Sequence, residues 1–248
     1  MSKKINGLVL WQGPSVLDGA PIALIATLKT SNVKTGDMVQ TWIIRTDVNP
    51  VEASKQSLDA SVCGGCPHRH SLGGACYVNI GQAPNAVFKT YTKGGYPTVQ
   101  QNPELLQLLQ GRKIRAGAYG DPAAVPAHVW APIVAMAAGV TGYTHQSAHR
   151  NFDPAILDFC MVSADTPKQA LRAHAAGART FRVRTPDAPM LAGEIECLAD
   201  SEGLSCADCL LCHGKRTAAP NVVITVHGSR AARYVSKYQR INLVPVAA

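Results

Sequence analysis

Long apolar runs are missing from this chain of 248 residues, and so is a recognisable export signal. No stretch approaches the roughly 18 apolar residues that a membrane-spanning helix needs, which argues against a helical membrane protein. The start, "MSKKINGLVLWQGPS", has a basic tip but only a short apolar run and no Ala-x-Ala-like cleavage site. A secretory leader normally has a longer apolar region and a cleavage site of that kind. We therefore expect a cytoplasmic protein.

Charged residues are also scarce, at 16% of the chain, and they form no basic tail. Lys and Arg still outnumber Asp and Glu by 24 to 16, which gives a net charge of +8. Such an excess suits a polyanionic partner, although it also serves solubility alone. Basic residues gather over 173–186 and 227–240, where Arg184, Arg230 and Arg233 are candidates for contacts with nucleic-acid phosphates. The second stretch fits an amphipathic surface helix equally well.

A Gly-rich dinucleotide fingerprint follows none of the expected strands, and the chain has no internal repeat. What is present from residue 99 onward is an alternation of strands and helices, which predicts parallel pairing and an α/β fold. With five or six such strand–helix units, we favour a partial or complete (β/α) barrel over an open doubly wound sheet. The expected helices cover 102–111, 125–139 and 166–177, and the expected strands cover 113–121, 139–146, 156–165, 179–186, 191–197 and 221–228.

The first part of the chain has a different texture. Short strands are expected over 6–13, 20–29 and 37–47, so residues 1–60 form a β-rich N-terminal segment. Residues 48–98 show little periodicity and many Gly, Pro and Asn, which predicts a loop region organised around cysteines. Residues 61–248 then form the barrel-like metal-binding part, and the two parts make one integrated domain.

Eight cysteines in a reducing compartment argue against disulfides and favour metal ligation. Seven of them fall into two groups, and Cys160, inside an apolar run, is expected to be a buried core thiol. The early set is Cys63, Cys66 and Cys76; the late set is Cys197, Cys206, Cys209 and Cys212.

The late set contains the Cys-x2-Cys-x2-Cys spacing that iron–sulfur ferredoxins use, with Cys197 available as a fourth ligand. A four-cysteine zinc site is the structural alternative, although zinc knots more often pair two Cys-x2-Cys arms. The spacing therefore favours a 4Fe–4S cluster over zinc.

The early set has three cysteines and no evident fourth. Three thiolates on a four-iron cluster leave one iron open for a substrate or cofactor. His68 or His70 would instead complete a zinc site of three cysteines and one histidine. An open three-cysteine site beside a closed four-cysteine site is the pattern of a cluster enzyme with an auxiliary cluster.

Polar residues stand where successive strands are expected to end. In a barrel, chemistry lies at the carboxyl ends of the strands, which makes Tyr119, Asp121, His145 and Asp165 the candidate catalytic residues. His145 is the best single candidate for acid–base work or ligation, because imidazole titrates near neutrality. Asp121 also fits turn chemistry before a proline, and Asp165 also fits a role in capping the next helix.

Several stretches, taken in order, resemble an uncharacterised family of bacteriophage and prophage proteins of the "gene product 88" type. They are "CGGCPHRHSLGGACYVNIGQAPNAVFKTY", "IRAGAYGDPAAVP", "GYTHQ", "MVSAD", "ARTFRVR", "ECLADSEGLSCADCLLCHGK" and "VVITVHGSR". That family is in turn similar to radical-SAM-like partial barrels, in which an early "C…CY" block binds the reactive cluster. Radical-SAM enzymes usually have Cys-x3-Cys-x2-Cys, whereas this chain has Cys-x2-Cys-x9-Cys.

The resemblance implies a phage-encoded iron–sulfur enzyme in the host cytoplasm that modifies a nucleic-acid base or nucleotide, with S-adenosylmethionine as a candidate cofactor. A second resemblance is to phage DNA-guanine transglycosylases of the 7-deazaguanine pathway, which are barrels with a late zinc site. It implies that Asp121 and Asp165 act as nucleophile and acid–base. A third reading is a non-enzymatic nucleic-acid-binding protein with structural zinc at both cysteine sets.

Overall fold

A single nine-stranded sheet forms the centre of the computed structural model, which describes residues 5–215 and 219–242. The strand order is β1-β2-β3-β4-β5-β6-β7-β9-β8. β1, β2 and β3 pair antiparallel, and every pair from β3 to β8 is parallel. The strands are β1 (Gly7–Pro14), β2 (Pro21–Thr27), β3 (Val39–Arg45), β4 (Lys113–Tyr119), β5 (Gly139–Thr144), β6 (Met161–Ala164), β7 (Thr180–Arg184), β8 (Glu194–Glu196) and β9 (Asn221–Thr225).

The α/β class predicted from the sequence is confirmed. Over the described ranges, β1 and β8 lie at opposite edges of the sheet, so the sheet is open. The complete form of the expected barrel is therefore not what these strands build, and the partial form stays a prediction. The three N-terminal strands join the same sheet through the parallel pairing of β3 with β4.

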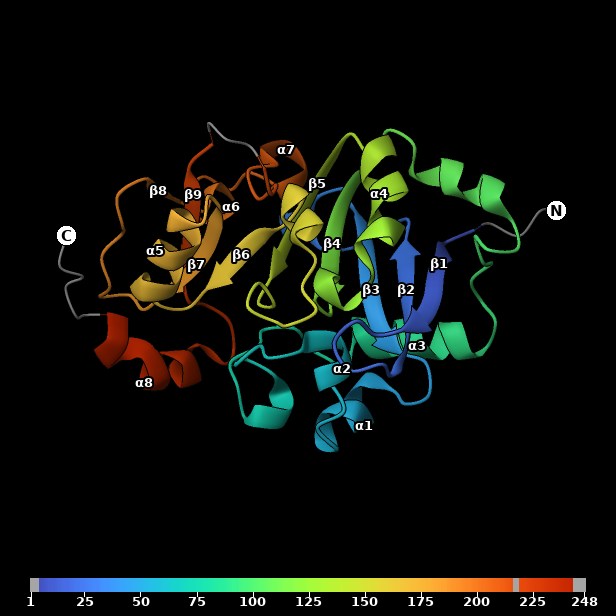
Figure 1. The fold of residues 1–248 in the computed structure, drawn as a ribbon, viewed down its shortest axis with the longest axis horizontal. Coiled ribbons are helices and arrows are strands. Elements are labelled where there is room, and N and C mark those ends of the chain that lie inside the picture. Colours follow the sequence, from blue (N-terminus) through green and yellow to red (C-terminus); the bar gives the residue numbers. More distant parts are fainter. Residues whose placement is uncertain (1–4, 216–218, 243–248) are drawn as a thin grey trace.

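Helices lie on both sides of the sheet (Figure 1). They are α1 (Pro50–Lys55), α2 (Ala60–Cys63), α3 (Ala83–Thr92), α4 (Ala127–Met136), α5 (Pro167–Ala175), α6 (Leu198–Ser201), α7 (Cys206–Cys209) and α8 (Ala231–Asn242). Short 3-10 helices are η1 (Val33–Thr35), η2 (His70–Leu72), η3 (Pro103–Leu109), η4 (Pro122–Ala124) and η5 (Pro154–Asp158). None of the described helices is long and apolar enough to cross a membrane.

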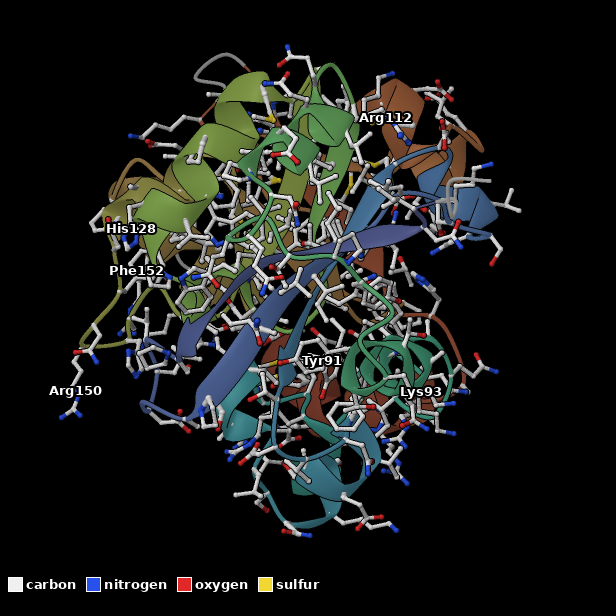
Figure 2. The ribbon with its side chains drawn as sticks, turned by 90° about the vertical axis from the view of Figure 1, so that its right-hand side faces the viewer. Tyr91, Lys93, Arg112, His128, Arg150 and Phe152 are labelled. Carbon is white, nitrogen blue, oxygen red and sulfur yellow. The ribbon has the colours of Figure 1, made fainter. Side chains whose placement is uncertain are left out.

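Three local expectations differ from the structure. The supposed loop region 48–98 contains α1, α2 and α3, and the helix expected over 102–111 is the 3-10 helix η3. The strand expected over 156–165 begins only at Met161, because η5 occupies its first part. α3 packs on the N-terminal strands, where the Tyr91 hydroxyl donates to Gln12 Oε1 at 2.5 Å. Figure 2 views this side of the molecule, and Arg150 extends away from its body.

The capping of α5 has a consequence for the site. Thr166 and Gln169 form a complete capping box, and Pro167 occupies the first turn. The Thr166 hydroxyl accepts from the Gln169 amide at 3.2 Å, so the neighbouring Asp165 carboxylate is not used as the cap. It points instead toward two histidines.

The part of the connection between β3 and β4 that contains α1, α2 and α3 lies below the strands in Figure 1, with α8 beside it. Arg230, which precedes α8, donates to the Gly74 carbonyl at 3.3 Å, and Arg233 donates to the Gly73 carbonyl at 3.2 Å. α8 thereby holds the loop that carries the early cysteines against the carboxyl ends of the parallel strands.

Candidate metal centre

A cavity of about 300 Å³ reaches the carboxyl ends of the parallel strands. Thiols of both cysteine sets line it, together with all four candidate catalytic residues. The predicted residues in its lining are Cys63, Cys66, Cys76, Cys197, Cys206, Tyr119, Asp121, His145 and Asp165. The structure therefore brings together residues from the connection after β3, from the ends of β4, β5 and β6, and from the segment after β8.

The early set sits on a loop that the chain fixes at several points. Cys63 ends α2, and its carbonyl accepts from Gln146 Nε2 at 2.9 Å. The amide of Gly65 donates to Gln146 Oε1 at 3.0 Å, and the amide of Cys76 donates to the His68 carbonyl at 2.9 Å. Gln146 thus ties the early loop to the end of β5. The sequence places Gln146 at a strand end, but its partners lie about eighty residues away and have no local signal.

The three early thiols act on one another electrostatically. Burial raises the pKa of Cys63 well above its ordinary value, and the neighbouring Cys66 and Cys76 raise it further. Burial likewise raises the pKa of Cys76 to about 11. Without a cation, Cys63 and Cys76 stay protonated at neutral pH. A bound metal ion would favour their deprotonated form, because metal binding and proton release are coupled.

The late set lies where β8 ends and around α7. Cys197 directly follows β8, whereas Cys206 begins α7 and Cys209 ends it. Burial raises the pKa of Cys212 to about 12, a hydrogen bond with Tyr143 opposes this, and the other three thiols raise it further. Cys212 therefore interacts electrostatically with the other three late cysteines.

The spacing of the thiols bears on which metal they suit. In a tetrahedral zinc site, Zn–S bonds of about 2.3 Å place the sulfurs about 3.8 Å apart. Among the described residues, the only three His, Cys, Asp or Glu side chains with ligand atoms all within 4.8 Å of one another are His68, His145 and Asp165. In neither cysteine set do three ligand atoms of the described residues lie as close to one another as in a tetrahedral zinc site.

The two histidines considered as fourth ligands have other partners. His70 Nε2 lies 2.9 Å from the Val78 carbonyl, which holds the early loop together. His68 Nε2 lies 2.7 Å from Asp165 Oδ1, across 97 residues of sequence. Asp165 is 1% exposed, and its other oxygen lies 3.4 Å from His145 Nε2.

These contacts change the charge states of the group. Burial acts to raise the pKa of Asp165, but the neighbouring His145 and His68 outweigh it and hold that pKa well below its ordinary value. Burial acts to lower the pKa of His145, but the neighbouring Cys66 and the Asp165 carboxylate together raise it well above its ordinary value. His145 therefore connects the early set to Asp165.

Asp121 has a supporting position. Its Oδ1 accepts from the amide of Ala123 at 3.0 Å, and its Oδ2 accepts from the amide of His145 at 2.8 Å and from Gln146 Nε2 at 3.3 Å. Burial raises its pKa, against these hydrogen bonds. Tyr119 lies beside it in the lining, and burial raises the pKa of its phenol well above the ordinary value.

The cavity also contains a cation, Arg115, that is not among the candidate residues predicted from the sequence. Arg115, on β4, donates from Nη2 to the Tyr77 hydroxyl at 2.7 Å, and its guanidinium lies 5.8 Å from the centre of the Tyr143 ring. Within the described part of the chain it has no carboxylate partner, whereas the other lining cations do: Lys34 pairs with Asp200 and Arg69 with Asp59.

The three arginines predicted to contact nucleic-acid phosphates all bond to other residues of the chain. Arg184 pairs with Glu196 and donates to the Ala188 carbonyl at 2.7 Å, while Arg230 and Arg233 hold the early loop as described above. Arg233 is exposed, and Arg184 and Arg230 are half-buried. None of the three lines the cavity.

Compared with models of known protein families, with curated proteins and with solved structures, the chain matches none.

Gly74→Ala is expected to disrupt the early loop, because a Cβ there would lie 2.4 Å from the His68 carbonyl carbon. That backbone cannot retreat without losing its hydrogen bond from the Cys76 amide. Under the sequence-based prediction that the early set binds metal, the variant should lose most of that metal, as measured by metal analysis of the purified protein. The matched control is Gly65→Ala, whose Cβ would meet only Gln146 Oε1 at 3.8 Å, an ordinary contact. Equal losses in both variants would contradict this explanation.

Proposed function

We propose that this protein is an iron–sulfur enzyme that modifies a nucleotide or a nucleic-acid base. One observation carries the proposal: thiols from two cysteine sets, far apart in the sequence, line one cavity together with buried acid–base groups. Reactive sites gather perturbed titratable groups in a concave pocket, as this cavity does.

The donor sets fit clusters better than single zinc ions. The thiols of each set interact electrostatically, yet neither set contains three ligand atoms within 4.8 Å of one another. A four-iron cluster binds each thiolate at a different iron and so tolerates this wider spacing. Cys63, Cys66 and Cys76 would hold a cluster with one iron open to the cavity, and the late set would hold a closed auxiliary cluster. When bound, such clusters supply one-electron chemistry.

The chain's own residues would then bind and orient the substrate. Arg115 is the cavity cation best placed for a phosphate or carboxylate, and Tyr77 and Tyr143 beside it offer flat faces to a base. The net charge of +8 suits a polyanionic substrate. S-adenosylmethionine at the open iron, the partial-barrel fold and the gene-product-88-type relationship belong to the same proposal.

The transglycosylase alternative receives less support. It needs Asp121 as a nucleophile or acid–base group, but both oxygens of Asp121 accept hydrogen bonds that hold η4 and the end of β5. A carboxylate in that position acts as a positioning residue for His145. The transglycosylase alternative also gives the early cysteine set no role.

Anaerobic purification followed by iron, sulfide and zinc analysis tests the proposal. Two four-iron clusters predict about eight iron and eight sulfide ions per chain, with broad absorbance at about 400 nm. A protein that contains zinc alone and does not absorb in that region would overturn it. Reconstitution with iron and sulfide before the measurement separates a lost cluster from one that never binds.

A further inference from the structure

Three side chains in the cavity wall form a compact group that neither cysteine set explains. His68 comes from the early loop, His145 follows β5, and Asp165 follows β6. His68 Nε2 and Asp165 Oδ1 are 2.7 Å apart, and His145 Nε2 and Asp165 Oδ2 are 3.4 Å apart. One ligand atom from each lies within 4.8 Å of the other two.

Two atoms of this group are buried without a hydrogen-bond partner: His145 Nε2 and Asp165 Oδ2. Asp165 itself is 1% exposed. A buried polar atom left unpaired costs about 1–3 kcal/mol, so native proteins rarely leave two of them facing each other. Their separation of 3.4 Å is long for a hydrogen bond, and an ion that both atoms contact would satisfy both.

The main chain around the group is fixed in advance. The Asp165 amide donates to Gln169 Oε1 at 2.8 Å, and the Asp165 carbonyl accepts from the Tyr234 hydroxyl at 3.0 Å. The His145 amide donates to Asp121 Oδ2 at 2.8 Å. Support of this kind from a surrounding shell is typical of metal ligands, because it sets their orientation before the ion arrives.

The ring of His68 is held from the other side by α8. It lies 5.5 Å from the ring of Tyr234 and 5.8 Å from that of Tyr238, measured between ring centres, and these two tyrosines stack on each other at 4.5 Å. Both tyrosines are buried. The imidazole is therefore packed in a defined place and is only 12% exposed.

We propose that His68, His145 and Asp165 form a further metal centre that takes one divalent first-row transition ion. Two imidazole nitrogens and one carboxylate oxygen are the ligand set of mononuclear non-haem Fe(II) sites, and they leave coordination positions open. Mg²⁺ and Ca²⁺ prefer oxygen ligands alone and suit this set less well. All three residues line the cavity, so the open positions face the same space as the early set.

This centre goes beyond the proposed iron–sulfur function and does not require it. Its ligands are nitrogen and oxygen atoms, whereas the clusters would use the seven thiols of the two sets. Cys66 adjoins His145, as its effect on the pKa of that histidine shows, so an ion here would lie next to the early set. The alternative is a hydrogen-bonded relay of the same three residues with no ion.

Anaerobic dialysis of the full-length protein against Co²⁺, followed by metal, iron and sulfide analysis, tests the centre. We expect the wild type to bind one equivalent of Co²⁺ that His68→Gln and Asp165→Asn bind at least about tenfold more weakly. Sulfide content and absorbance at about 400 nm should be the same in all three proteins. If the clusters are absent, His68→Gln and Asp165→Asn should still bind one equivalent of Co²⁺ less than the wild type. The absorption of that one equivalent should lack the intense sulfur-to-cobalt band that thiolate ligands give.

His70→Gln is the matched control, because His70 lies on the same loop, lines the same cavity and bonds to a main-chain carbonyl instead. It should bind Co²⁺ as the wild type does. Unchanged Co²⁺ binding by His68→Gln and Asp165→Asn would mean a hydrogen-bonded relay only and would overturn the centre. So would a loss of Co²⁺ that is matched by a loss of sulfide, since the three residues would then support the early set. If Asp165→Asn does not fold, the half-buried His68→Gln decides alone.

Discussion

Under the proposed iron–sulfur function, replacing Cys66 with serine is expected to remove about half of the bound iron and sulfide, because one of the two proposed four-iron clusters loses a ligand. Activity should be lost entirely, since the early set has only three thiols. Cys206→Ser should remove the other half and leave the early cluster in place. Iron and sulfide per chain, with the absorbance at about 400 nm, measure both effects.

Cys160→Ala is the control for these variants. Cys160 is 1% exposed and belongs to neither set; its sulfur packs against Gly142, where a Cβ would lie 2.6 Å from it. Removing the sulfur leaves a small cavity and costs about 1 kcal/mol of stability, while iron and sulfide stay at the wild-type level. A Cys66→Ser protein with full iron and sulfide would show that the early set binds no cluster.

Arg182→Met is expected to lower the free energy of unfolding by about 3–5 kcal/mol, because it leaves a buried carboxylate without its partner. The side chains of Arg182 and Glu194 are both 0% exposed. Arg182 Nε and Nη2 donate to the two carboxylate oxygens at 2.7 Å and 2.6 Å, and Nη2 also donates to the Pro189 carbonyl at 2.9 Å. Urea unfolding of variant and wild type measures the difference.

The double variant Arg182→Met with Glu194→Met should regain much of this loss, because replacing both charges removes the unpaired carboxylate. Arg184→Met is the matched single control. It lies two residues along the same strand, but its partner Glu196 is 44% exposed and can be solvated, so we expect a loss of about 1 kcal/mol or less. Equal losses in the two single variants would refute the role given to burial.

The ion pairs matter for the site because they hold β8 in place. β8 has three residues and lies at the edge of the sheet, beside β9. Glu194 and Glu196 at its two ends reach past β9 to Arg182 and Arg184 on β7. Cys197 comes next in the chain. A thiol of the late set therefore depends on charges that lie outside the cavity.

The strands and their polar ends could be predicted from the sequence because both are local patterns. Apolar runs bounded by turn residues gave β4, β5, β7 and β9, and the residues that follow β4, β5 and β6 do line one cavity. The helix α3 was missed because "APNAVFKTYT" contains few strong helix formers. Its order comes from packing, with Val87 5% exposed and Tyr91 bonded to Gln12.

The contacts that define the site could not be predicted, since they join residues that are remote in the chain. His68 meets Asp165 across 97 residues, and Gln146 meets Cys63 across 83. The role of Asp165 also depended on whether Asp165 or Thr166 caps α5, which the sequence left open. Once Thr166 serves as the helix cap, the Asp165 carboxylate can turn toward the histidines.

The position of α8 links the early cysteine loop to the order in which the chain is synthesised. The arginines that hold Gly73 and Gly74 lie 160 and 156 residues further along the chain, and the tyrosines that pack on His68 belong to the same helix. A ribosome that has made the early loop must still make the rest of the sheet before α8 emerges. The contacts that α8 makes with the early loop can therefore form only after residues 231–242 have left the exit tunnel, later than the contacts with Gln146.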